Sequence, residues 1–202
     1  MLFRSLFDPH IWFDAKLWSY CPFAVADALI QLDSEAASHY QHRAEKYSQD
    51  LLELDENVRK KFNEIPRQRR VLITAHDAFR YFGRAYGLEV IGVQGTSTES
   101  EAGLADMNQL VDLVVRRRIP AVFVETSVSD RNVTALIEGA SARGHIVHLG
   151  GRLYSDALGP AGGGGDTLER ALLSNVDTIF GALRATSASQ NVSQGISRDS
   201  NK

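Results

Sequence analysis

Cysteine is almost absent from this 202-residue chain, because Cys21 is the only one. A single cysteine cannot close a disulfide within the chain, and no second thiol stands at the spacing of a thiolate metal site. Long apolar runs are absent too, since no stretch approaches the roughly 20 residues that a membrane-spanning helix needs. We therefore expect no internal disulfide, no cysteine-built metal site and no membrane-spanning segment.

An excess of positive charge is also absent. The 22 lysines and arginines stand against 25 aspartates and glutamates, which leaves a formal net charge of -3. Binding to nucleic acid or to an anionic membrane depends on a strong positive field. The charge balance therefore predicts no nucleic-acid partner.

The two ends of the chain predict little about function. The first residues, MLFRSLFDPH, lack the apolar region and small-residue cleavage site of an export signal. Residues 186–202 are polar, rich in Ser, Asn and Gln, and without periodicity, which predicts a disordered tail.

A long amphipathic helix is predicted over residues 34–65, where apolar or small residues recur in steps of three and four. Ser34 is the expected N-cap, and Pro66 ends the pattern. The preceding segment also has helical character, but Pro22 cannot lie inside a helix without removing a backbone hydrogen bond. A break is therefore expected at Tyr20–Cys21, with Pro22 opening a second short helix.

The rest of the chain alternates short apolar runs with helical segments. This pattern is typical of parallel strands joined by helical crossovers, so it predicts an α/β domain with a four-stranded parallel sheet flanked by helices. The predicted strands are residues 70–75, 89–93, 120–125 and 145–150.

Side chains able to bind a ligand follow these strands at the edge where parallel strands end. His76 follows the first strand, residues 94–103 follow the second, Glu125 ends the third, and Asp156 lies beyond the fourth. Histidine and carboxylate without thiolate is a ligand set for Zn²⁺ or Mn²⁺, and it also resembles an acid–base constellation.

Each of these residues also has a purely structural interpretation. His76 could cap a helix that starts at Asp77, Glu125 could be a polar strand end, and Asp156 could serve a turn. His10 could be an exposed terminal residue. The remaining histidines are predicted to be solvated or away from the binding edge: His39, His42, His145 and His148.

Several separated motifs carry a resemblance to a known family. They are DPHIWFDAKLW, RVLITAHDAFRYFGRAYGLEVIGVQG, STESEAGLADMNQLVDLVVRRRIPAVFVETSVS, GGRLYSDALG and NVDTIFGALR, in that order from Asp8 to about Arg184. Together they resemble the extracytoplasmic metal-binding proteins of zinc and manganese ABC importers.

The resemblance implies two α/β lobes joined by a long helix, with one divalent ion held between them. It implies that His10, His76 and Asp156 are metal ligands, and that Glu125 lines the site. Pro9 would stiffen the presentation of His10. The bound ion would be Zn²⁺ or Mn²⁺, the compartment periplasmic or extracytoplasmic, and the partner the importer's permease.

The resemblance also divides the chain. An N-terminal lobe carrying a fourth ligand, normally histidine, is largely absent, so we expect a truncated chain with a partial site. The expected parts are a remnant of the inter-lobe or N-terminal region (1–33), a backbone helix (34–66), a C-terminal metal-binding lobe (67–185) and a disordered tail (186–202).

The function expected from these observations is that of a solute-binding component and not of an enzyme. Two histidines with a carboxylate favour zinc over manganese, although a manganese-selective protein could carry the same residues. Two alternatives remain open: a metal-dependent hydrolase with Glu125 as base, and a folded remnant that binds nothing.

Overall fold

The structure, a computed structural model, describes residues 8–95 and 104–196. The four predicted strands are present and parallel, which confirms the α/β class. They pair as β1 with β2 and β3 with β4, and β1 lies against β3 without a continuous ladder of hydrogen bonds. Their bounds are Val71–His76 for β1, Glu89–Gln94 for β2, Ala121–Glu125 for β3 and His148–Leu153 for β4.

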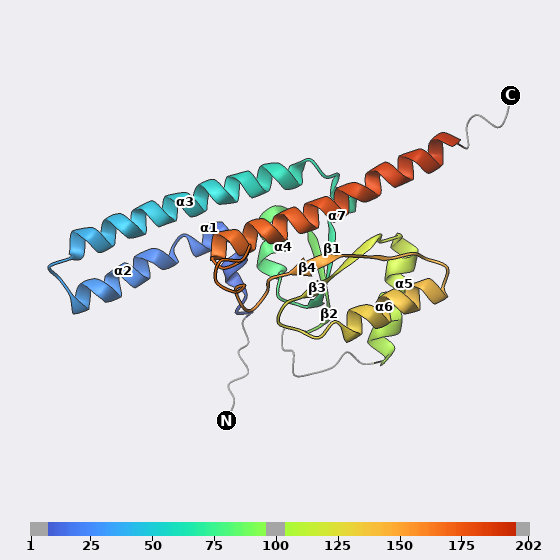
Figure 1. Cartoon of the computed structure of the whole chain (residues 1–202), viewed down its shortest axis with the longest axis horizontal. Helices are drawn as coiled ribbons and strands as arrows, with labels where there is room; N and C mark the ends of the chain where they lie inside the picture. The colour runs from blue at the N-terminus through green and yellow to red at the C-terminus, as the bar shows by residue number, and fades with distance from the viewer. Residues whose placement is uncertain (1–7, 96–103, 197–202) are drawn as a thin grey trace.

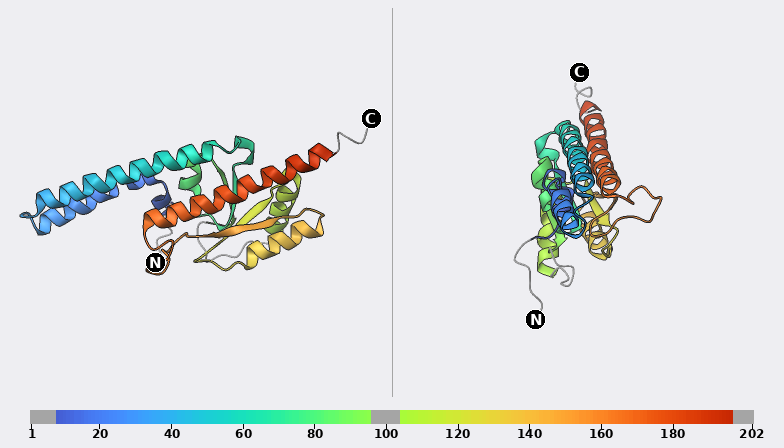
Figure 2. Two further views of the ribbon diagram at one scale, coloured as in Figure 1. Left: turned by 45° about the horizontal axis from the view of Figure 1, so that its top comes forward. Right: turned by 90° about the vertical axis from the view of Figure 1, so that its left-hand side faces the viewer.

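Helices cover both faces of the strands (Figure 1). On one face lie α3, α4 and α7, and on the other lie α5 and α6 (Figure 2). Side chains alternate between these faces along each strand, as the pleat requires: Leu72 packs toward α3, α4 and α7, whereas Ile73 packs toward α5 and α6. The bounds are Ala37–Asn63 for α3, Arg80–Tyr86 for α4, Leu104–Arg117 for α5, Arg131–Ala142 for α6 and Leu168–Ile196 for α7.

The N-terminal segment is folded against this body. A 3₁₀ turn, η1 (Ile11–Phe13), leads into α1 (Ala15–Trp18) and α2 (Cys21–Leu32), and α2 packs along α3 as a hairpin that reaches beyond the strands (Figures 1 and 2). The predicted break before α2 is confirmed. Pro22 lies in the first turn of α2, where a backbone N–H would find no intrahelical acceptor, so its missing N–H breaks no hydrogen bond.

The long helix is also confirmed, but its predicted N-cap is wrong. α3 has 27 residues and begins at Ala37. Asp33, and not Ser34, accepts a hydrogen bond from the backbone N–H of Ala36 at 3.3 Å. The helix ends at Asn63, three residues before Pro66. This is expected, because proline has no backbone N–H with which to continue the helical hydrogen bonds.

The fourth strand begins three residues later than predicted. His145 lies before it, with Nε2 2.8 Å from the carbonyl oxygen of Ile119. The strand also ends three residues later than predicted, so that Gly151 lies in β4 beside Gly150. The backbone there passes against other elements: a Cβ on Gly150 would lie 2.6 Å from the Phe123 ring, and Gly151 has a φ of 141°.

The tail is helical further than predicted, because α7 continues to Ile196. Residues 186–194 contain neither proline nor glycine, so a helix already formed on β4 can propagate through them at little cost. Residues 197–202 lie outside the described part of the chain. Among the described residues, no helix is both long and apolar enough to cross a membrane.

Candidate metal centre

His76 ends β1, and its side chain is completely buried. The Glu125 carboxylate holds it twice: Oε1 accepts from the backbone N–H of His76 at 2.8 Å, and Oε2 lies 2.6 Å from ring Nδ1. Burial lowers the pKa of His76, but the Glu125 and Asp156 carboxylates raise it by more, so its pKa is above the ordinary value. Because Nδ1 faces Glu125, the other ring nitrogen, Nε2, points away from that carboxylate.

His10 is buried and held by its own short motif. Oδ1 of Asp8 accepts a hydrogen bond from the backbone N–H of His10 at 3.0 Å and lies 2.7 Å from its Nδ1. Pro9, between them, restricts the backbone. His10 is therefore not an exposed terminal residue, and its Nε2 faces the same point as that of His76.

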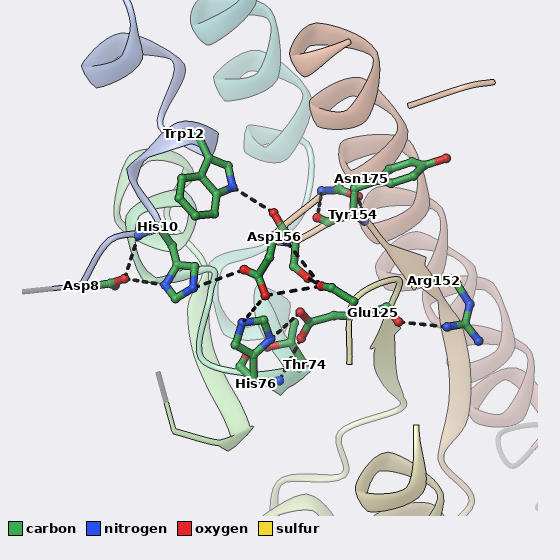
Figure 3. A network of polar contacts seen from close by, with 12 residues as sticks. Asp8, His10, Trp12, Thr74, His76, Glu125, Arg152, Tyr154, Asp156 and Asn175 are labelled. Atoms are coloured by element: carbon green, nitrogen blue, oxygen red, sulfur yellow. Dashed lines mark hydrogen bonds and ion pairs between the residues drawn. The ribbon is translucent and has the colours of Figure 1, made fainter. Parts of the chain in front are cut away.

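Asp156 lies in the irregular segment after β4 and completes the cluster (Figure 3). Its Oδ1 is 3.4 Å from Nε2 of His10, and its Oδ2 is 3.4 Å from Nε2 of His76. One ligand atom from each of these three residues lies within 4.8 Å of the others. The carboxylate is 37% exposed, so solvent reaches the cluster from this side.

The arrangement suits a divalent cation. Two imidazole Nε2 atoms and one carboxylate surround a common point, and each Nδ1 faces a carboxylate that fixes the ring and increases its basicity. Nε2 of the buried His76 makes no hydrogen bond with any described residue, and it faces Asp156 Oδ2 across 3.4 Å. Since buried polar atoms are normally paired, Nε2 of His76 is suited to a bound cation.

The structural interpretation of His76 as a helix cap is wrong. The next helix, α4, begins at Arg80 and has Phe79 at its N-cap position. Glu125 is fully buried behind His76 rather than beside the point that the ligand atoms share. Its carbonyl oxygen accepts a hydrogen bond from the Arg152 guanidinium at 2.9 Å, which ties the end of β3 to β4.

Two neighbours of the cluster, Asp8 and Trp12, were given no role from the sequence. Asp8 could have been found, because a carboxylate two residues before a histidine can reach its ring. Trp12, which reaches Ser155, gave no local signal. Ser127, near Asp156, follows the third strand, at the edge where the sequence predicts ligand-binding side chains. Residues 96–103, part of the predicted edge, lie outside the described residues. The histidines that were discounted lie elsewhere, and three are exposed: His39, His42 and His148.

Comparison with known proteins decides the family. A family model described as ZnuA, the periplasmic zinc-uptake complex component A, matches residues 4–182. The chain belongs to this family. The ZnuA relatives include the zinc-binding protein TroA of Treponema pallidum, 49% identical over 177 residues, and the manganese-binding lipoprotein MntA of Bacillus subtilis, 45% identical over 178 residues.

The solved structures agree with this membership of the ZnuA family. The periplasmic zinc-binding protein TroA of Treponema pallidum superposes with a TM-score of 0.85 at 48% identity, over 91% of this chain and 66% of that one. Each of the two sequence relatives is matched over 88% of this chain but 58% of its own length. The chain thus spans somewhat more than half of these relatives.

Proposed function

We propose that this chain captures Zn²⁺ or Mn²⁺ as the substrate-binding component of an ABC importer. His10, His76 and Asp156 are the proposed ligands. The observation that carries the proposal is the convergence of these three side chains, from the N-terminal segment, β1 and the segment after β4, with their ligand atoms within 4.8 Å of one another.

The chemistry of the three ligands supports this function. Neutral imidazoles donate through Nε2, and Asp156 supplies a negative charge that the cation attracts. Asp8 and Glu125 hold the two rings from behind, so little ordering remains to be done when the ion arrives. Water, or a further ligand as the family resemblance implies, would complete the coordination shell. Two nitrogen donors favour zinc over manganese.

The proposed parts of the chain follow the same reasoning. We assign residues 1–33 to the inter-lobe or N-terminal region, residues 34–66 to the backbone helix and residues 67–185 to the metal-binding lobe. Delivery would be to an ABC permease, in the periplasmic or extracytoplasmic space, since the relatives are named as periplasmic proteins or lipoproteins.

The position of Glu125 does not favour a metal-dependent hydrolase. A metal-dependent hydrolase needs a general base that reaches the metal-bound water. Both carboxylate oxygens of Glu125 lie against His76, one at its backbone N–H and one at its ring, so Glu125 orients a ligand instead.

Calorimetric titration with Zn²⁺ and then Mn²⁺ tests the proposal. The wild-type chain should bind one ion, and His76→Ala and Asp156→Ala should each weaken binding at least 100-fold. His42→Ala, which removes an exposed imidazole from α3, is the matched control and should bind like wild type. A folded wild-type chain that binds neither ion would overturn the proposal in favour of a remnant.

A further inference from the structure

Trp12 joins the two ligand-bearing segments that lie furthest apart in the sequence. It follows His10 by two residues in η1, and its indole N–H donates a hydrogen bond to the carbonyl oxygen of Ser155 at 3.0 Å. Ser155 directly precedes Asp156. A single side chain thus connects the segment of His10 with that of Asp156, across 143 positions of sequence (Figure 3).

The indole also contacts the first ligand itself. The rings of Trp12 and His10 meet edge to face, with centroids 5.3 Å apart and an interplanar angle of 67°. Aromatic pairs with this geometry prefer a fixed mutual orientation. Trp12 therefore restrains the His10 ring on one side and the backbone before Asp156 on the other.

Asp156 depends on such restraint more than the two histidines do. His76 is fixed by a strand and by Glu125, and His10 by Asp8. Asp156 lies outside any helix or strand, its side chain is 37% exposed, and its contacts with the Ser127 hydroxyl are long, at 3.4 Å. The residue just before it is held more closely: the Ser155 hydroxyl lies 2.5 Å from the Ser127 hydroxyl, and the Ser155 carbonyl accepts the 3.0 Å bond from Trp12, which ties this segment to that of His10.

We propose that Trp12 is a positioning residue for the metal site: its indole N–H holds the Ser155 carbonyl so that the Asp156 carboxylate faces His10. This inference rests on the proposed metal-binding function. Since neither atom of this hydrogen bond is a proposed ligand atom, the bond can organise the site before the ion binds and lower the ordering needed on capture. Trp12 supplies no ligand atom and acts only through the two residues that it contacts, His10 and Ser155.

The test compares two substitutions of the same chemical kind. Trp12→Phe keeps an aromatic ring and removes the N–H donor, and Trp18→Phe makes the same change at the other tryptophan of the chain. Zn²⁺ affinity by calorimetry should fall about tenfold in Trp12→Phe, in the range for residues that orient metal ligands, and stay within twofold in Trp18→Phe. Thermal unfolding of the metal-free variants should be similar.

A spectroscopic measurement covers the case in which Trp12→Phe does not fold. The Trp18→Phe protein retains Trp12 as its sole tryptophan, so its one indole N–H resonance reports the bond directly. That N–H should exchange slowly with solvent, and the Trp12 emission should change on addition of Zn²⁺. Fast exchange like that of free indole would overturn the proposal.

The outcomes separate this inference from the proposed function. If wild type binds Zn²⁺ and folded Trp12→Phe binds it equally well, the positioning role is wrong and the metal site stands. If wild type binds no ion, the proposed function fails first, and slow exchange of the indole N–H would then mark a purely structural bond.

Discussion

Glu125 contacts His76 with both carboxylate oxygens, one at the backbone N–H and one at ring Nδ1. The two residues end neighbouring strands, β1 and β3, that are not joined there by a regular ladder. The carboxylate therefore connects the strands and orients the imidazole at the same time. Because of this double role, a substitution of Glu125 tests the site as directly as a substitution of one of the proposed ligands.

Glu125→Gln should weaken Zn²⁺ binding between 10- and 100-fold without abolishing it. The amide oxygen can still accept the backbone hydrogen bond, but the negative charge that increases the basicity of His76 is lost. Calorimetry measures the change. Unchanged affinity would show that the negative charge of Glu125 does not contribute to Zn²⁺ binding through His76.

Asp8→Asn tests the equivalent support of His10. The side chain would keep an acceptor for the backbone N–H of His10 while losing its charge, so we expect about tenfold weaker Zn²⁺ binding. Asp50→Asn is the control, because this carboxylate pairs with Lys46 on the exposed surface of α3. An equal loss of affinity in both variants would contradict a local role for Asp8.

Gly150→Ala should destabilise the fold by about 1 to 3 kcal/mol, the usual cost of overpacking a core. The added methyl group would lie 2.6 Å from the Phe123 ring, which is fully buried and cannot move aside easily. Urea unfolding followed by circular dichroism measures the loss. Gly164→Ala, where a Cβ meets open space, should change stability by less than about 0.5 kcal/mol.

The Glu89–Arg117 pair predicts a small pH dependence of stability. Hydrogen bonding to the Arg117 guanidinium lowers the pKa of Glu89 below its ordinary value. A lowered pKa in the folded state stabilises above the unfolded-state pKa, and the benefit is lost as pH falls through the folded-state value. Because Glu89 is half exposed, its contribution at pH 7 should be about 0.5 kcal/mol.

Glu89→Gln should therefore remove about this amount at pH 7 and almost nothing near pH 3. Urea unfolding at both pH values checks the difference. Glu56→Gln is the comparison, since Glu56 and Lys60 are both largely exposed and 3.6 Å apart, and it should change stability less. A loss for Glu89→Gln that is the same at both pH values would contradict the titration of this pair.

The sequence predicted most of the fold because its periodicity is regular. The four strands and the long helix follow from local patterns of apolar residues, and parallel topology places His76, Glu125 and the segment of Asp156 at one edge. The errors lie where tertiary contacts override local preference. The predicted fourth strand ended at Gly150, whereas β4 continues through Gly151 to Leu153, because the glycine backbone can pass against Phe123 and Thr178.

The candidate site was only partly predictable for a related reason. No rule of spacing brings His10 to the carboxyl edge of the strands, and only the family resemblance suggested it. The bond from Trp12 to Ser155 joins residues 143 positions apart, and its acceptor is a backbone carbonyl that every residue carries. Contacts of this kind leave no trace in a single sequence.

The wide separation of His10 and Asp156 along the chain has a thermodynamic consequence. An ion held by both would close a loop of nearly 150 residues, which exists only when the N-terminal segment, β1 and the segment after β4 are all in place. An unfolded chain cannot offer such a site, so occupancy is linked to folding. At a free ion concentration 100 times the dissociation constant, the folded state would gain about 2.7 kcal/mol. A bound ion would therefore protect the folded chain from proteolysis until the ion is released.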